Sequence, residues 1–414
     1  MDISRTYDVI VVGGGISGTM AAISAAREAA HTLLVERYSA LGGMGTLGLV
    51  QPITTWGLGK NYVVGGTGRR ILEELAQSHP YAATGMTTYG PSCDSEYLKW
   101  CLECRAVDAG VDLLYHSWVR DVTTAQDGRI TSLVALTKAG DVVLKGKTII
   151  DASGDADVAA FAGVPFDVGS QGITLMFLVA GIDRQRCGKR NEISRVYGER
   201  RVGYRGLALF WHARPDAAYF NVTEVENHNA LDPVDLTRAT VDCRRQAWQI
   251  LEIMRKHAPG FEEAYIAETA PALGVRETRR IKGLFTLGLD DVKRGGSFPD
   301  AIARAGCPVD VHGSADNGKG DYWGLSASYA IPYRSLIAAE TPNLIVTGRP
   351  ISADHAAHSS LRRMAPGFAL GEAAGVAAAL TGEGDVRELD TGALRETLRQ
   401  YGAILDPEDE IPSG

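Results

Sequence analysis

Residues 7–18, YDVIVVGGGISG, decide the fold, because an apolar strand leads into the spacing Gly13-x-Gly15-x-x-Gly18 and then into an alanine-rich helix. In this pattern Gly13 permits a tight turn, Gly15 lets the backbone approach a pyrophosphate, and Gly18 allows the helix to pack closely on the strand. The helix N-terminus, with Ile16 and Ser17, adds amide donors and the positive end of the helix dipole. The stretch therefore predicts a Rossmann-like α/β domain that binds a dinucleotide.

An acidic residue follows at the expected place. The second apolar run, residues 32–35 (TLLV), ends at Glu36, eighteen residues after Gly18, and Arg37 comes next. A carboxylate at this position accepts hydrogen bonds from the ribose hydroxyls of an adenosine. Strand, glycines, helix, strand and carboxylate in this register indicate a complete adenosine-binding unit.

Two later segments return to the same domain and indicate which dinucleotide binds. Residues 147–155 (KTIIDASGD) and 342–352 (PNLIVTGRPIS) are each a buried strand that breaks into a glycine-containing turn. A nicotinamide dehydrogenase more usually completes its nucleotide domain within one contiguous stretch, so this arrangement favours a flavoprotein.

Further segments carry a family resemblance that spans roughly residues 7–382. They are LGGMGT at 41–46, LGVRETRRIKG at 273–283 and RRMAPGFALGEAAG at 362–375. The chain resembles the glutathione-reductase-like FAD oxidoreductases with two dinucleotide-binding domains, in the branch that carries an LGGxxT segment. It departs from the family's RVMPTCMALGQAAG by a proline shifted by one position and by the lack of a cysteine.

The resemblance implies FAD as the cofactor and a small organic substrate, which is oxidised when it delivers a hydride to flavin N5. It places the N-terminus of the helix after Pro366 at the pyrimidine edge of the flavin, where its dipole stabilises negative charge. The expected cofactor-binding residues are Gly13, Gly15, Ile16, Ser17, Gly18, Glu36, Arg37, Gly42, Gly43, Met44, Thr46, Ala152, Ser153, Gly154, Asp155, Gly348, Asp354, Gly367, Phe368 and Ala369.

The expected architecture is an FAD-binding domain with a parallel sheet and a β meander, interrupted by an α+β substrate or cap lobe. The boundaries are 1–168 for the first part of the FAD-binding domain, 169–334 for the cap lobe and 335–414 for the C-terminal part. Helices are expected at 67–77, 95–109, 234–257 and 369–380. The polar, glycine-rich segment 313–324 is either a mobile lid or an ordinary solvent loop.

Three residues are the candidates for catalysis. His355 and His358 lie in the segment that the resemblance places on the flavin side. Imidazole titrates near neutral pH, and a C–H oxidation needs a base for the proton that it releases. The sequence does not distinguish which histidine is the base. Arg276 is expected either to anchor a carboxylate or oxyanion or to form a structural ion pair. Trp211, Trp323 and Tyr329 are expected to be substrate walls or core aromatics.

The electron acceptor stays open between oxygen, a quinone and a redox protein. Residues 65–68 (GGTG) lack the spacing of a second dinucleotide fingerprint, so an internal NAD(P)H domain is not supported. A reductase or monooxygenase that uses an external reductant is the main alternative, and a non-catalytic or RNA-modifying flavoprotein is a more distant one.

Composition bounds the remaining possibilities. The 414 residues are 45% hydrophobic and 22% charged, carry a net charge of −8 and contain no basic block, which counts against nucleic acid or a membrane as the main partner. The N-terminus lacks the features of a signal peptide, so we expect a cytoplasmic protein. The expected oligomeric state stays open and includes a homo-oligomer. Cys101 and Cys104 lie on a predicted helix and are expected to be structural, and no metal site is expected.

Overall fold

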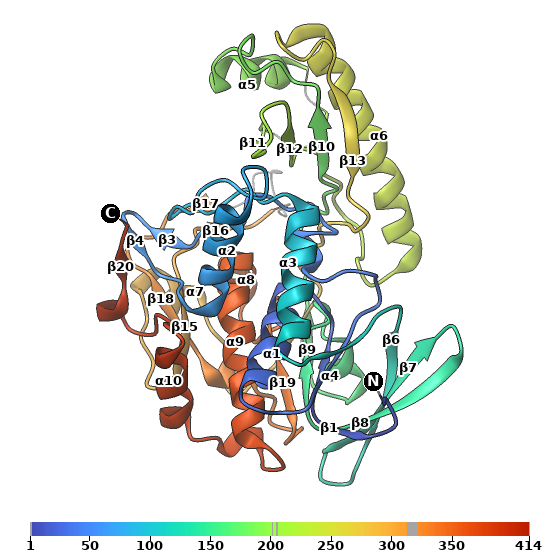
Figure 1. The fold of residues 1–414 in the computed structure, drawn as a ribbon, viewed down its shortest axis with the longest axis vertical. Helices are drawn as coiled ribbons and strands as arrows, with labels where there is room; N and C mark the ends of the chain where they lie inside the picture. The colour runs from blue at the N-terminus through green and yellow to red at the C-terminus, as the bar shows by residue number, and fades with distance from the viewer. Residues whose placement is uncertain (1, 201, 204–205, 313–321, 414) are drawn as a thin grey trace.

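A parallel β-sheet forms the centre of the larger body (Figure 1). The computed structural model describes residues 2–200, 202–203, 206–312 and 322–413. The parallel strands run in the order β5-β2-β1-β8, and β19 pairs with β8 on the far side. Their bounds are β1 Thr6–Val12, β2 Thr32–Val35, β5 Asp112–Leu114, β8 Gly140–Asp151 and β19 Leu344–Val346. The residues of β2 (TLLV) and β19 (LIV) are all buried, as expected of strands covered on both faces.

Two helices pack tightly across this sheet. They are α1 (Ile16–Arg27) and α9 (Met364–Thr381). A Cβ on Gly371 would overlap the Ser17 carbonyl, and one on Gly375 would overlap the Ala21 carbonyl, so glycine is what lets the helices approach. Of the described helices, α9 alone has the length and apolar composition of a membrane span, and 78% of that window is buried within the protein.

The predicted β meander is confirmed. The N-terminal half of β8 pairs antiparallel with β7, which pairs with β6, whereas the C-terminal half of β8 pairs parallel with β1 and β19. One long strand therefore belongs to both layers. The meander strands are β6 Trp118–Thr124 and β7 Ile130–Thr137, and the short helix α4 (Asp157–Phe161) follows β8.

A second sheet stands at the top of the molecule in Figure 1 and forms what we call the cap lobe. Its antiparallel strands run in the order β11-β12-β10-β13, and α5 and the long α6 flank it. The bounds are β10 Phe177–Ala180, α5 Arg190–Glu199, β11 Leu209–Trp211, β12 Ala218–Phe220, α6 Pro233–His257 and β13 Tyr265–Thr269. Asp232 caps α6 by accepting from the amides of Val234 and Asp235, and Pro233 occupies the first turn.

The expected range of the cap lobe, 169–334, also contains elements that lie beside α9. Ile302 and Ala303 of β15 belong to the same buried cluster as Ala373 and Ala377 of α9. The remaining helical elements are η1 Gly43–Gly45, α2 Gly66–Ser78, α3 Ser95–Asp108, α7 Leu289–Arg294, η2 Tyr333–Leu336, α8 His355–Leu361, η3 Val386–Glu388, α10 Thr391–Gln400 and η4 Pro407–Asp409. The remaining strands are β3 Gly57–Leu58, β4 Asn61–Tyr62, β9 Phe166–Val168, β14 Arg279–Ile281, β15 Ala301–Ala305, β16 Val309–Asp310, β17 Tyr322–Trp323, β18 Tyr329–Pro332 and β20 Ile411–Pro412.

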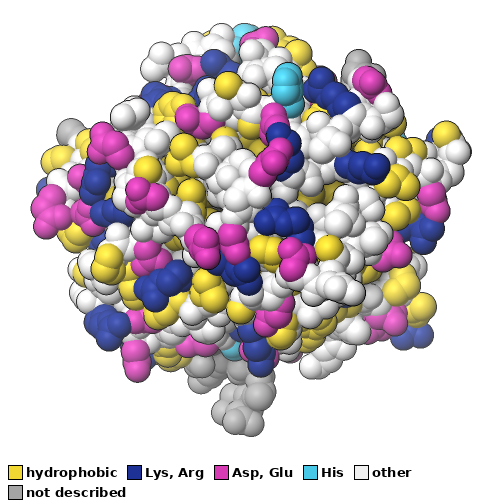
Figure 2. Space-filling view, turned by 90° about the horizontal axis from the view of Figure 1, so that it is seen from below, with side chains coloured by type: hydrophobic (Ala, Val, Ile, Leu, Met, Phe, Trp, Pro, Cys, Tyr) yellow, Lys and Arg dark blue, Asp and Glu magenta, His cyan; other side chains and the backbone are white. Residues whose placement is uncertain are grey.

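The surface seen from below carries mixed charge. On that face Lys and Arg side chains alternate with Asp and Glu, and hydrophobic side chains lie between them (Figure 2).

Candidate functional site

Each glycine of the fingerprint is required at its position for a different steric reason. Gly13 has φ +101°, and a Cβ there would overlap the Ala152 carbonyl. A Cβ on Gly18 would overlap the Gly13 carbonyl, whereas one on Gly15 would meet nothing within 4 Å. Gly13 and Gly18 therefore close the strand–helix turn, and the open space at Gly15 leaves room for a phosphate group beside the start of α1.

Glu36 lies at the end of β2 with 7% of its surface exposed. Its Oε2 accepts from the Gly14 amide at 2.5 Å and its Oε1 accepts from the Tyr38 amide at 2.8 Å. These bonds fix the carboxylate and still leave lone pairs for further donors. The geometry suits an acceptor for ribose hydroxyls.

A cavity of about 870 Å³ extends from this fingerprint to the cap lobe. Its size is typical of a site for a cofactor and a small ligand. Most of the residues expected to bind the cofactor line it. They are Gly13, Gly15, Ile16, Ser17, Glu36, Arg37, Gly43, Met44, Ala152, Ser153, Gly154, Asp155, Gly348 and Gly367.

The other expected cofactor residues lie behind the wall. Gly18 packs against Gly13, and the Gly42 amide donates to the Gly14 carbonyl at 2.8 Å. Thr46 is buried and donates to the Leu41 carbonyl at 2.6 Å. Asp354 caps α8 through the Ala357 amide, and Phe368 packs on Trp56, with ring centroids 5.4 Å apart. Ala369, the next residue of α9, is also buried. These residues shape the site rather than face it.

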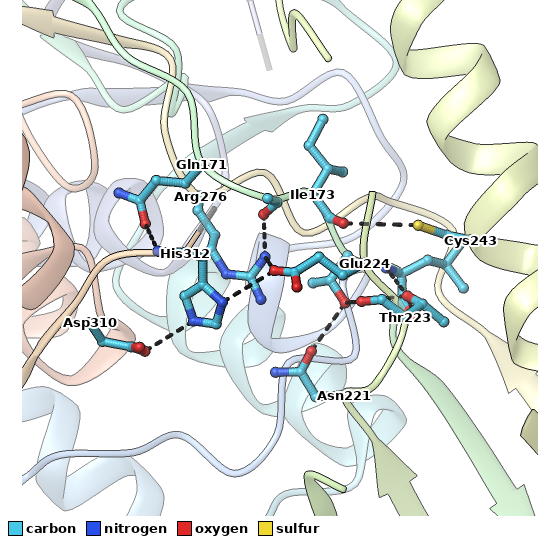
Figure 3. A network of polar contacts seen from close by, with 12 residues as sticks. Gln171, Ile173, Asn221, Thr223, Glu224, Cys243, Arg276, Asp310 and His312 are labelled. Atoms are coloured by element: carbon cyan, nitrogen blue, oxygen red, sulfur yellow. Dashed lines mark hydrogen bonds and ion pairs between the residues drawn. The ribbon is translucent and has the colours of Figure 1, made fainter. Parts of the chain in front are cut away.

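A polar network occupies the end of the cavity nearest the cap lobe (Figure 3). His312 Nε2 lies 3.1 Å from Asp310 Oδ2, and His312 Nδ1 lies 3.3 Å from Glu224 Oε1. The same Glu224 oxygen lies 3.7 Å from Arg276 Nη1, which also donates to the Gly172 carbonyl. Arg276, Asp310 and His312 line the cavity, so the network faces it.

The N-terminus of α9 meets this network. Arg363 precedes the helix and pairs with Asp310, and Arg362 donates to the Asp310 carbonyl at 3.2 Å. Burial alone would raise the pKa of Asp310, but the hydrogen bond to His312 and the charges of Arg363 and Arg362 lower it well below its usual range. Asp310 is therefore ionised at neutral pH.

The predicted bases, His355 and His358, are not among the residues that line the cavity. His355 Nδ1 lies 2.8 Å from the buried carboxylate of Glu277, and its side chain is 45% exposed on the other side. His358 is fully buried, its Nε2 lies 3.1 Å from the Arg349 carbonyl, and burial lowers its pKa to about 3. Both rings surround Glu277, a partner that is distant in sequence.

The three aromatic residues expected to be substrate walls or core aromatics lie away from the cavity. Trp211 lies under the Arg184 guanidinium at 4.3 Å, Trp323 is 38% exposed, and Tyr329 is buried against Ser360. None of the three lines the cavity among the described residues. Within the segment 313–324, expected to be either a lid or a solvent loop, residues 313–321 lie outside the described residues.

The predicted structural role of the cysteines fits their positions. Cys101 and Cys104 lie on α3 as free thiols, and burial raises the pKa of Cys101. Neither lines the cavity. The described residues contain no group of three His, Cys, Asp or Glu side chains that would suit a metal ion.

Comparison with known proteins identifies the family. The sequence profile of the FAD dependent oxidoreductase family matches residues 8–398. The chain belongs to this family. The predicted family, enzyme class and FAD cofactor are thereby confirmed.

Individual relatives are more distant. A thiamine thiazole synthase of Aeropyrum pernix is 29% identical over 161 residues, which cover 36% of this chain and 54% of the relative. That of Methanococcus aeolicus is 32% identical over 162 residues, 37% of this chain and 57% of the relative. The match thus spans little more than half the length of these relatives. A solved structure of a triple mutant of the flavin-dependent brominase Bmp2 has a TM-score of 0.50 and 13% identity, over 95% of this chain and 84% of that one, and confirms the Rossmann-type fold.

The residues present fit FAD. The open space at Gly15 and the fixed carboxylate of Glu36 suit the pyrophosphate and the adenosine ribose. The buried hydroxyl of Thr347, on the cavity wall, has no hydrogen-bond partner among the described residues, which a polar ligand would supply. Gly348, with φ +83°, and Gly367 keep the wall free of side chains where the cofactor passes α9.

Sequence reasoning missed three residues of the site: Glu224, Asp310 and His312. One signal was present, because Asp310 and His312 are alternate residues in an extended segment and therefore share a face. Glu224 carried no comparable pattern, since it reaches His312 across 88 positions of the chain.

Proposed function

We propose that this FAD-dependent oxidoreductase oxidises a small organic substrate held at the cap-side end of the cavity, with His312 taking up the proton that the oxidation releases. The observation that carries the proposal is the position of His312. It is the one histidine among the described residues that line the cavity, and it lies in the network that adjoins the N-terminus of α9. FAD, when bound, accepts the hydride of this oxidation.

Both ring nitrogens of His312 face carboxylates, Asp310 on one side and Glu224 on the other. An imidazole that has taken up a proton donates from both nitrogens, so the ring would then donate to both carboxylates. Asp310 also orients the ring, because Arg363 holds that carboxylate in place.

The cap lobe supplies room and shape for the substrate. Ala208, Leu231 and Leu236 give the cavity an apolar wall, and Thr174 and Asn221 add polar groups at its edge. Such a wall excludes water and leaves orientation to a few polar contacts. We therefore place the substrate between this wall and the network of His312.

The test is the reductive half-reaction of the FAD-loaded protein. A metabolite panel is added without oxygen, and the flavin band near ~450 nm is followed. With a substrate that bleaches the band, His312→Gln should retain FAD but slow bleaching by about 10²–10⁴-fold, the range for loss of a general base. His257→Gln, on the exposed end of α6, is the matched control and should bleach at the wild-type rate.

Two results would contradict the proposal. An unchanged single-turnover rate in His312→Gln removes the residue from proton transfer. Bleaching with NADH or NADPH only, and with no metabolite, would instead favour the reductase or monooxygenase alternative. His355→Gln, compared in the same assay, tests the histidine that the sequence favoured.

A further inference from the structure

Arg362 is a cation on the cavity wall without a carboxylate partner among the described residues. Its Nη2 donates to the Asp310 carbonyl at 3.2 Å, and its Nε is buried with no hydrogen-bond partner. Buried charges in proteins are normally paired, because an unpaired one loses its hydration without compensation. The position therefore calls for an explanation.

The neighbouring guanidinium groups already have their counter-charges. Arg276 pairs with Glu224, Arg363 with Asp310 and Arg280 with Glu277. Three of these four guanidinium groups thus have a carboxylate partner, and Arg362 has none among the described residues. Burial, together with the charges of Arg363 and Arg276, lowers the pKa of Arg362, as expected where a cation is destabilised and an anion would be stabilised.

The rest of the substrate space narrows the class of anion. Arg362 lies two residues before Met364, the first residue of α9, so a ligand that reaches it also lies near the positive end of an 18-residue helix. The cap-lobe wall beyond it is aliphatic, through Ala208, Leu231 and Leu236. The aromatic residues among the described wall, Tyr38 and Trp118, lie beside Arg37 at the adenosine end instead.

We infer that the substrate is an aliphatic carboxylate whose anionic group pairs with Arg362 and whose hydrocarbon part lies against the cap lobe. The inference deepens the proposed function and rests on it. A guanidinium binds a carboxylate with two parallel hydrogen bonds, and Arg362 has the unpaired charge and the buried Nε that such a ligand would satisfy. Arg276, on the same wall, adds a second positive group nearby.

Binding of inert ligands to the FAD-loaded protein tests this without turnover. Straight-chain carboxylates from acetate to octanoate, and the matching neutral amides, are titrated while the flavin spectrum is followed. We expect the carboxylates to bind more tightly as the chain lengthens, and each amide to bind at least tenfold more weakly than its acid. Arg362→Gln should weaken carboxylate binding at least tenfold with FAD retained, and Arg362→Lys should restore part of it.

The matched control is Arg238→Gln on α6, whose side chain is 68% exposed, and it should bind carboxylates as the wild type does. Equal binding of acids and amides would overturn the inference. So would an Arg362→Gln variant that loses FAD or changes the flavin spectrum while its carboxylate affinity stays unchanged, because Arg362 would then pair with the cofactor. Inorganic phosphate that binds as tightly as the carboxylates, with the same dependence on Arg362, would overturn the carboxylate assignment.

The two proposals fail in different ways. The proposed function fails if the flavin of His312→Gln bleaches at an unchanged rate. That result says nothing against equilibrium binding of carboxylates. Failure of the inference appears in the binding series itself, whatever the rate of any variant.

Discussion

Glu277→Gln should destabilise the protein strongly and in a pH-dependent way. The Glu277 side chain is fully buried and forms an ion pair with Arg280 at 2.8 Å and another with His355 at 2.8 Å. Gln171 Nε2 donates to it at 3.0 Å. Glutamine has nearly the same shape but no charge, so the Arg280 guanidinium would remain buried without its counter-charge.

The magnitude follows from the carboxylate's own titration. Burial alone would raise the pKa of Glu277, but the hydrogen bonds from His355 and Gln171 outweigh it and lower the pKa to about 2 from an ordinary 4.5. Each pH unit corresponds to about 1.36 kcal/mol, so the ionised group contributes about 3 kcal/mol to the unfolding free energy at neutral pH. Removal of one partner of a buried ion pair lowers the unfolding free energy by a comparable amount, about 3–5 kcal/mol.

The sign of the pH dependence is set by the lowered pKa. Because the folded protein holds the proton more weakly than the unfolded chain does, the stabilisation is complete above the ordinary pKa of 4.5 and is lost as pH falls toward 2. Urea unfolding followed by circular dichroism should therefore show a gap of about 3 kcal/mol between wild type and Glu277→Gln at pH 7, falling to about half at pH 3.

A surface pair provides the control. Glu96 of α3 is 72% exposed beside Lys99, and Glu96→Gln should change the unfolding free energy by less than about 1 kcal/mol. The reasoning about Glu277 is refuted if its variant is as stable as the wild type at pH 7, or if the gap is the same at pH 3 and pH 7.

Three further outcomes are expected. Glu36→Ala should lower FAD retention after gel filtration, measured as the ratio of flavin to protein absorbance, because it removes the carboxylate beside Gly14; full occupancy after dilution would contradict the assignment. Gly375→Val should lower the unfolding free energy by about 1–3 kcal/mol, because its side chain forces α9 away from the Ala21 carbonyl. Gly198→Ala, where a Cβ meets nothing within 4 Å, should leave the unfolding free energy unchanged or raise it slightly. Equal effects of the two substitutions on the unfolding free energy would refute the close packing. Burial and the neighbouring Asp155 and Asp151 raise the pKa of Asp157 to about 6. The unfolding free energy of the wild type should therefore fall by about 1–3 kcal/mol as pH rises from about 4 to 6. Asp157→Asn should flatten that part of the stability profile, and parallel profiles would speak against the raised pKa.

Local pattern was enough for the nucleotide-binding half of the site. The turn at Gly13, the start of α1 and the carboxylate of Glu36 depend on residues within one strand–helix–strand unit, and the structure has each where the spacing predicted. Helices with clear periodicity and caps were also predicted well, and α6 agrees with the expected 234–257 to within one residue.

The start of α9 shows a different limit. The helix was expected from residue 369, but the structure begins α9 at Met364, since proline is tolerated within the first turn, where its missing amide has no helical partner. The presence of Gly371 and Gly375 inside α9 has a tertiary reason, because both meet the backbone of α1.

The sequence by itself determined the fold class and the cofactor, because these depend on short-range spacing of glycines, apolar runs and one carboxylate. Only the tertiary structure decided which ionisable groups face the cavity. His355 and His358 turn to the buried Glu277, 78 or more positions away, whereas His312 joins Glu224 and Asp310 at the cavity. The physical reason is that a buried charge must find its partner in space, and the chain does not record that partner at any fixed distance along the sequence.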